Sequence, residues 1–282
     1  MYMIMVYLGE NDKGTKFMMK NVKEAKRIVI KVGTSTLTHR SGRLNLKLMD
    51  RLAMVLSDIK NSGKEVILVT SGAVTAGMNK MGLKERPKEI KEKQAAASVG
   101  QCELMFIYDK LFSQYGHVVS QLLLTKEVTE NDILRNNVIN TFETLLSYHV
   151  LPIINENDSV AIDELVYGDN DMMSAVTVKI LNADLLIILT DQEGLYEGNP
   201  HDDPDARFIP LVEKIDESVE AFAGGSVSGV GTGGMAAKIH AAKLVVDHGT
   251  NVIIANGDRP ERLYDILEGR PVGTLFLAQN EK

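Results

Sequence analysis

Short apolar runs alternate with longer helical patterns along this chain, and that alternation limits the possible folds more than any other feature. Four of the runs are RIVIKV at 27–32, EVILVT at 65–70, VLPII at 150–154 and DLLIIL at 184–189. Strands that are apolar at nearly every position are buried on both faces, as in parallel sheets covered by helices. The chain is therefore predicted to form an α/β fold with a mainly parallel central sheet.

The remaining elements follow from the same periodicities. Helical patterns occur at 46–62, 94–112, 131–148, 235–246 and briefly from 260, and further strands are predicted at 117–124, 251–255 and 274–277. Regular structure is expected to begin at Arg27. Residues 1–26 are therefore interpreted as an N-terminal extension and 27–282 as one domain.

Composition excludes several classes of function. The 282 residues carry a net charge of -7, which argues against a general nucleic-acid binder because phosphate backbones attract clustered lysine and arginine. The single cysteine, Cys102, cannot form an intramolecular disulfide, so a reducing cytoplasm is the expected location. Its apolar helical context predicts that Cys102 is buried. No segment reaches the length of a transmembrane helix, and no signal peptide is predicted.

The stretch GGSVSGVGTGGMAAK at 224–238 is the clearest candidate for a binding loop. Glycines allow a backbone to approach a ligand closely, consecutive N–H groups can point at an anion, and the helix that follows adds the positive end of its dipole. Lys238 would lie about one turn into that helix. Because the GK[ST] of a Walker A loop is missing, the interpretations left open are a different phosphate-binding loop and a mobile surface loop.

Polar residues gather at the carboxyl ends of the predicted strands, where open α/β sheets bind ligands. They are Lys31 in the first strand, Ser71 after the second, NEND at 155–158 with GDND at 168–171 beyond it, and Thr190-Asp191. Each has a structural alternative, since a lysine can extend its amine to solvent and Ser, Asp and Asn can cap helices. Their repeated position at strand ends favours a binding site.

This set of residues suits phosphoryl transfer, which depends on positioning and on charge stabilisation by groups such as lysines and backbone N–H donors. A carboxylate acceptor is already deprotonated at neutral pH and requires no catalytic base. Lysines and a magnesium ion would allow it to approach a polyphosphate. No Ser/His/Asp order, His/Cys ligand spacing or dinucleotide fingerprint points to a different chemistry.

Seven motifs in a fixed order make the hypothesis more specific. They are KVGTSTLT (31–38), VTSGAVTAG (69–77), INENDSVA (154–161), GDND (168–171), LTDQEGLY (189–196), SVSGVGTGGMAAK (226–238) and GTLF (273–276). From about Arg27 onward, the chain closely resembles the glutamate-phosphorylating members of the amino acid kinase family.

The resemblance implies an open αβα sandwich, ATP as co-substrate, Mg²⁺ as cofactor, and transfer of the γ-phosphoryl group to the side-chain carboxylate of L-glutamate, the first step of proline biosynthesis. By motif match, Lys31 and Lys238 would be catalytic, and Asp171 would orient both lysines. The implied substrate-binding residues are Ser71, Asn155, Asp158 and Asn170. The implied nucleotide-binding residues are Lys31, Thr190, Asp191, Thr232, Gly233, Gly234, Met235, Ala236, Ala237 and Lys238, and no direct metal ligand is assigned.

The family pattern also implies a homo-oligomer, feedback inhibition by proline, and transfer of the labile product to glutamyl phosphate reductase. Many members carry a C-terminal PUA domain, whereas this chain ends soon after GTLF and is expected to be the catalytic domain alone. The alternatives are a family member with another carboxylate or phosphate acceptor, and a non-catalytic proline or nucleotide sensor. Thr34 after Gly33 disfavours the first, and the intact lysines and GDND carboxylates disfavour the second.

Overall fold

A central β-sheet organises the computed structural model, which describes residues 21–160, 170–200, 202–222 and 234–279. Its strands are β1 (Arg27–Val32), β2 (Glu65–Val69), β3 (Val119–Leu124), β4 (Leu151–Glu156), β5 (Leu185–Thr190), β8 (Leu211–Val212), β9 (Asn251–Asn256) and β10 (Thr274–Phe276). They form one eight-stranded sheet in the order β3-β4-β2-β1-β5-β9-β10-β8. All pairs from β3 to β9 are parallel, which confirms the predicted α/β fold.

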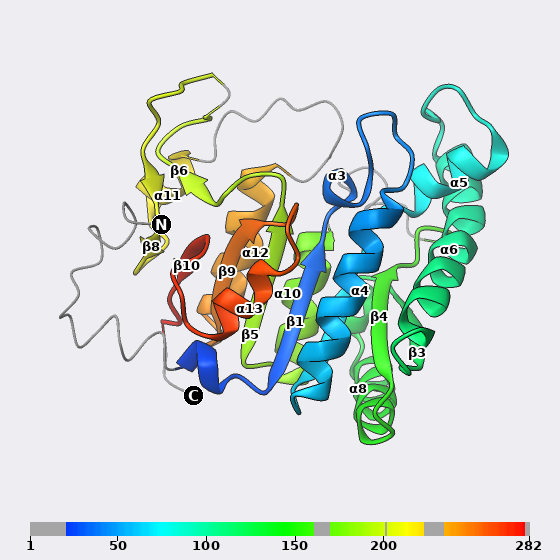
Figure 1. Cartoon of the computed structure of the whole chain (residues 1–282), viewed down its shortest axis with the longest axis horizontal. Coiled ribbons are helices and arrows are strands. Elements are labelled where there is room, and N and C mark those ends of the chain that lie inside the picture. The colour runs from blue at the N-terminus through cyan, green and yellow to red at the C-terminus, as the bar shows by residue number, and fades with distance from the viewer. Residues whose placement is uncertain (1–20, 161–169, 201, 223–233, 280–282) are drawn as a thin grey trace.

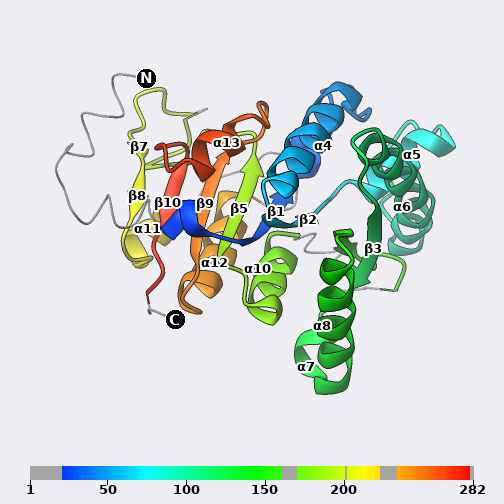
Figure 2. The same cartoon turned by 60° about the horizontal axis from the view of Figure 1, so that its bottom comes forward.

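Helices cover both faces of this sheet (Figures 1 and 2). They are α3 (Thr34–Leu37), α4 (Leu46–Asn61), α5 (Ala73–Met81), α6 (Ile90–Ser113), α7 (Glu127–Glu130), α8 (Asp132–Ser147), α10 (Asn170–Leu181), α11 (Glu217–Phe222), α12 (Met235–Val246) and α13 (Arg262–Leu267). Buried residues of α4, α6 and α13 belong to one hydrophobic cluster, and those of α8, α10 and α12 belong to the other. The molecule is therefore an αβα sandwich.

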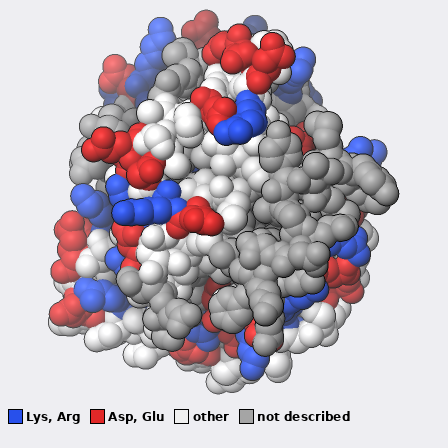
Figure 3. All heavy atoms as spheres, turned by 90° about the vertical axis from the view of Figure 1, so that its left-hand side faces the viewer, with Lys and Arg blue, Asp and Glu red and all other residues white. Residues whose placement is uncertain are grey.

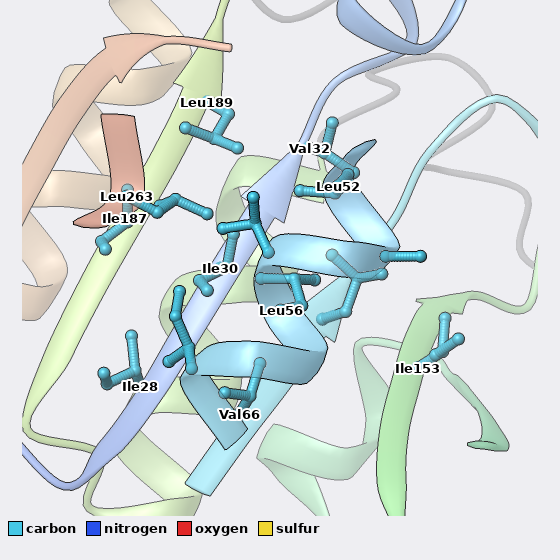
Figure 4. Packing of buried hydrophobic residues seen from close by; sticks show 14 of the residues in the cluster. Ile28, Ile30, Val32, Leu52, Leu56, Val66, Ile153, Ile187, Leu189 and Leu263 are labelled. Carbon is cyan, nitrogen blue, oxygen red and sulfur yellow. The ribbon is translucent and has the colours of Figure 1, made fainter. Parts of the chain in front are cut away.

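The strand at the centre of the sheet, β1, separates the two hydrophobic layers. Figure 4 shows Ile28, Ile30 and Val32 of β1 packed toward Leu52 and Leu56 of α4. Because side chains alternate along a strand, the residues between them face the opposite layer. That alternation turns Lys31 toward α10 and α12, so its amine does not extend to solvent: the residue is only 5% exposed.

Several local predictions need correction. A short antiparallel ribbon of β6 (Leu195–Tyr196) and β7 (Phe208–Ile209) was not expected, and β10 runs antiparallel to β9. Residues 21–24 are already helical, so regular structure begins before Arg27. Cys102 is exposed because α6 turns its neighbours Gln101 and Leu104 toward the interior instead.

The surface agrees with the modest net charge. Figure 3 shows acidic and basic side chains interspersed on the described part of the face that carries β8 and β10. Among the described residues, no helix is both long enough and apolar enough to cross a membrane.

Candidate active site

Lys31, Asp171 and Lys238 form a buried cluster of charges at the carboxyl edge of the sheet. Lys31 Nζ lies 2.5 Å from Asp171 Oδ1, and Lys238 Nζ lies 3.1 Å from Asp171 Oδ2. The lysines are 5% and 6% exposed, and Asp171 is completely buried. The end of β1 and the first turns of α10 and α12 supply the three side chains, so segments far apart in the sequence meet at one point.

The electrostatic balance of the cluster favours an anionic ligand. Burial by itself raises the pKa of Asp171, but the charges and hydrogen bonds of Lys31 and Lys238 outweigh burial and hold that pKa below its usual value. Asp171 is therefore ionised and faces two ammonium groups. A buried site with one negative and two positive charges needs a further negative charge for balance, which a phosphoryl group supplies.

Three polar side chains meet beside this cluster. Asn170 Nδ2 donates one hydrogen bond to Ser71 Oγ at 3.0 Å and one to Asn155 Oδ1 at 2.9 Å. Ser71 follows β2, Asn155 lies near the end of β4, and Asn170 begins α10 next to Asp171. The turn after β2 is tight, with Gly72 in the left-handed region at φ 97°, which a side chain would strain. The structure thus brings these three predicted substrate-binding residues together.

Gln101 of α6 is a member of this network that the sequence analysis did not identify. Its Oε1 accepts a hydrogen bond from Asn155 Nδ2 at 2.8 Å, and both residues are buried. One signal was available, because Gln101 lies on the same helical face as the buried residues Ala97, Leu104 and Tyr108. A polar residue within a buried helical face requires a partner, which Asn155 provides here.

Asp158, two residues beyond β4, is a half-buried residue whose environment differs from that of Asp171. Burial raises the pKa of Asp158 to about 6, and no cation of the described chain offsets that effect. A carboxylate held in this way is suited to pair with a positively charged group of a ligand.

The other side of the cluster is formed by the ends of β5 and β9. Thr190 Oγ1 donates to Asp191 Oδ1 at 3.1 Å, and Asn256 Nδ2 donates to the Asp191 carbonyl at 3.2 Å. Gly257 N–H donates to the Thr190 carbonyl at 2.7 Å, and a Cβ at Gly257 would lie only 2.7 Å from Thr36 Cγ2. Asn256 and Gly257 therefore hold the predicted nucleotide-binding pair in place, and neither was predicted.

The predicted phosphate-binding loop is described only in its last part. Gly234 is the extended N-cap of α12 and has no side-chain cap among the described residues, and Met235, Ala236 and Ala237 form the first turn of the helix. Backbone N–H groups at such an uncapped helix start can donate to an anion. Thr232 and Gly233 lie outside the described residues.

The sequence profile of the amino acid kinase family matches residues 26–256. The chain belongs to the amino acid kinase family. It is 50% identical over 266 residues to a Clostridium perfringens protein named glutamate 5-kinase, an alignment that covers 93% of this chain and 99% of the relative. A Listeria innocua protein of the same name is 50% identical over 269 residues, with 94% and 98% covered.

Solved structures agree with this membership of the amino acid kinase family at the level of the fold. Carbamate kinase from Giardia lamblia bound to AMP-PNP is 17% identical and superposes with a TM-score of 0.63 over 90% of this chain and 99% of its own. A product complex of isopentenyl phosphate kinase from T. acidophilum is 18% identical, with a TM-score of 0.61 and coverages of 89% and 100%.

Mg²⁺, which family membership leads us to expect, is compatible with the side chains at this site. No group of three or more His, Cys, Asp or Glu residues in the described ranges is arranged to hold a metal. Magnesium in kinase sites is commonly bound through substrate phosphates, waters and only one or two carboxylates. Asp191 is an exposed carboxylate in the pair predicted to bind nucleotide and fits that requirement.

Proposed function

We propose that this chain transfers the γ-phosphoryl group of ATP to the side-chain carboxylate of L-glutamate. The observation that carries the proposal is the pair of buried lysines held by one carboxylate, Asp171, next to a group of neutral polar side chains. The proteins named glutamate 5-kinase, which are 50% identical over nearly the whole chain, support the same acceptor. The reaction would supply the first intermediate of proline biosynthesis.

In this mechanism a carboxylate oxygen of glutamate attacks the γ-phosphorus as the bond to the leaving ADP breaks. Lys31 and Lys238 donate hydrogen bonds to the transferring phosphoryl group and stabilise its charge, while Asp171 holds both amines in position. No proton has to be removed, because the acceptor is already ionised. Mg²⁺, held by the phosphates with Asp191 as a protein ligand, would neutralise part of the phosphate charge.

We assign the two ends of the site to the two substrates. Ser71, Asn155, Asp158 and Asn170 hold glutamate, with the carboxylate of Asp158 as the counter-charge for its ammonium group. Thr190, Asp191 and the residues from Thr232 to Lys238 hold the nucleotide. The first group surrounds the ends of β2 and β4, and the second lies at the end of β5 and the start of α12. Lys31 of β1 lies between them in the strand order.

Three further properties are proposed from the family resemblance. The chain assembles into a homo-oligomer, proline inhibits it, and its labile acyl phosphate passes to glutamyl phosphate reductase. Light scattering tests the first property, for which a mass near 31.0 kDa would indicate a monomer and contradict it. Proline added to the assay described next tests the second, and co-elution with the reductase tests the third.

The decisive experiment is an assay with ATP, Mg²⁺ and an amino-acid acceptor, in which hydroxylamine traps the acyl phosphate as a hydroxamate. L-Glutamate is compared with L-aspartate and N-acetyl-L-glutamate. We expect hydroxamate from L-glutamate and little from the other two. Preference for another acceptor would replace glutamate in the proposal, and no hydroxamate from any of them would contradict a carboxylate acceptor.

A further inference from the structure

Four side-chain amides are joined by hydrogen bonds in a continuous chain at the end of the site assigned to glutamate. This chain of amides is called the amide relay. Gln101 Nε2 donates to Gln121 Oε1 at 3.0 Å, Asn155 Nδ2 donates to Gln101 Oε1 at 2.8 Å, and Asn170 Nδ2 donates to Asn155 Oδ1 at 2.9 Å. The members come from β3, α6, β4 and α10. All three bonds have the same direction: each runs from a donor nearer Asn170 to an acceptor nearer Gln121.

The direction of the relay is anchored by a backbone group. The N–H of Glu156 donates to Asn155 Oδ1 at 2.9 Å. Because a backbone N–H can only donate, the carbonyl oxygen of Asn155 must face it, and the NH₂ group must then face Gln101. An acceptor at position 101 is therefore required, since Asn155 is only 1% exposed and water cannot replace it.

The relay ends at Asn170, whose two amide hydrogens are both used in hydrogen bonds and whose carbonyl oxygen is still available to accept one. Asn170 Nδ2 gives its two hydrogens to Asn155 and to Ser71. Its Oδ1 is buried and has no hydrogen-bond partner within the described part of the chain. Buried carbonyl oxygens are nearly always paired, so this one indicates a donor that arrives with a ligand. An ammonium group has three N–H donors, whereas a carboxylate has none at neutral pH.

We propose that the amide relay makes Asn170 Oδ1 the acceptor for the ammonium group of the amino-acid substrate, and that Gln101 is the positioning residue that keeps it so. This inference rests on the proposed function and extends it to substrate selectivity. A residue at position 101 that cannot accept leaves the buried Asn155 Nδ2 without a partner, so the Asn155 side chain shifts although the Glu156 N–H still fixes its direction. Asn170, which donates to Asn155 Oδ1, shifts with that residue, and its own Oδ1 is then misaligned for the ammonium group.

The test compares L-glutamate with glutarate, the same dicarboxylate without the ammonium group, in the hydroxamate assay at saturating MgATP. We expect Gln101→Met to lower kcat/KM for glutamate by about tenfold, the loss of roughly one hydrogen bond to a charged group, and to leave glutarate nearly unchanged. In Gln101→Glu the new carboxylate accepts a hydrogen bond from Asn155, and the exposed amide of Gln121 can turn so that its NH₂ donates to that carboxylate. This variant should therefore recover the preference for glutamate. Gln94→Met makes the same change about two turns earlier in α6 and should have no effect.

The possible results distinguish a failure of the relay proposal from a failure of the proposed function. Unchanged kinetics in Gln101→Met, or an equal loss with both acceptors, would overturn the relay while the reaction itself stands. A wild-type chain that phosphorylates no amino acid would overturn both. If Gln101→Met lacks a cooperative melting transition, Gln101→Lys, which donates but cannot accept, replaces it with the same expected loss of selectivity.

Discussion

At the scale of single residues, Asp171 pairs with both Lys31 and Lys238, so replacing Lys238 tests the contribution of one lysine while the other pair stays in place. We expect Lys238→Ala to lower kcat by about 10²- to 10³-fold, because one charge-stabilising donor is removed while Lys31 still neutralises Asp171. The melting temperature should stay close to that of the wild type. Single-turnover and steady-state rates measure the effect.

Lys243→Ala is the matched control for that exchange. Lys243 lies in the same helix and forms an ion pair with Glu220 on the surface. It should keep wild-type kcat, since exposed pairs contribute little to stability and this one lies outside the site. A Lys238→Ala enzyme as active as Lys243→Ala would contradict the catalytic assignment.

The half-buried carboxyl group of Asp158 predicts a pH profile. The pKa of this group is raised to about 6 by burial, and only its ionised form can pair with the ammonium group of glutamate. We therefore expect kcat/KM for glutamate to fall by about tenfold per unit below pH 6, a profile that reports the free enzyme. Asp158→Asn should raise the KM for glutamate rather than that for ATP and should abolish this inflection.

The same residue affects stability with a definite sign. A carboxyl group with a raised folded-state pKa stabilises the folded chain fully below its unfolded value of 3.8, and this contribution is lost as the pH rises through 6. Asp158→Asn should therefore gain stability relative to the wild type above pH 6, by at most about 3 kcal/mol. Urea titrations at pH 4.5 and pH 7.5 measure the difference, and a constant offset between the two proteins would contradict the assignment.

At the scale of elements, α5 and α6 approach so closely that only glycine fits at their contact. A Cβ at Gly77 would lie 1.7 Å from the Ala96 carbonyl oxygen, and one at Gly100 would lie 1.7 Å from that of Ala73. Alanine generally favours helices over glycine. We nevertheless expect Gly100→Ala to destabilise the fold by at least about 2 kcal/mol, because backbone atoms would have to move to make room for the Cβ. Gly198→Ala is the control, since a Cβ there would lie 3.9 Å from Ala206 Cβ, an ordinary van der Waals contact. Denaturant midpoints of the two variants decide the matter.

The sequence predicts elements well where one periodicity persists. The strand Arg27–Val32 and the helix Met235–Val246 have the predicted limits, because a buried strand is apolar throughout and a glycine run marks the start of the helix. The antiparallel direction of β10 was missed, since strand direction depends on the path of the connection before it and not on the strand's own residues. Gln101 was missed for a similar reason, because its partner Asn155 lies in a strand far along the chain.

At the scale of the whole molecule, the site joins the two halves of the sheet, so a nucleotide should stabilise the complete fold. We expect the non-hydrolysable analogue AMP-PNP with Mg²⁺, at about 100 times its Kd, to raise Tm by roughly 5 °C. Lys238→Ala should show a much smaller shift at the same concentration. Differential scanning calorimetry measures both, and a shift equal in the two proteins would place the nucleotide away from Lys238.

The position of β1 in the strand order also affects how the chain is made. β1 is synthesised before the other strands of the described sheet, yet its two neighbours are β2, which follows soon, and β5, which emerges from the ribosome only after β3, β4 and α10. Until then, the nascent sheet exposes an unpaired apolar edge, a form of structure that readily associates with other chains. Molecular chaperones that shield such edges should therefore bind this chain during translation and release it once β5 has paired with β1.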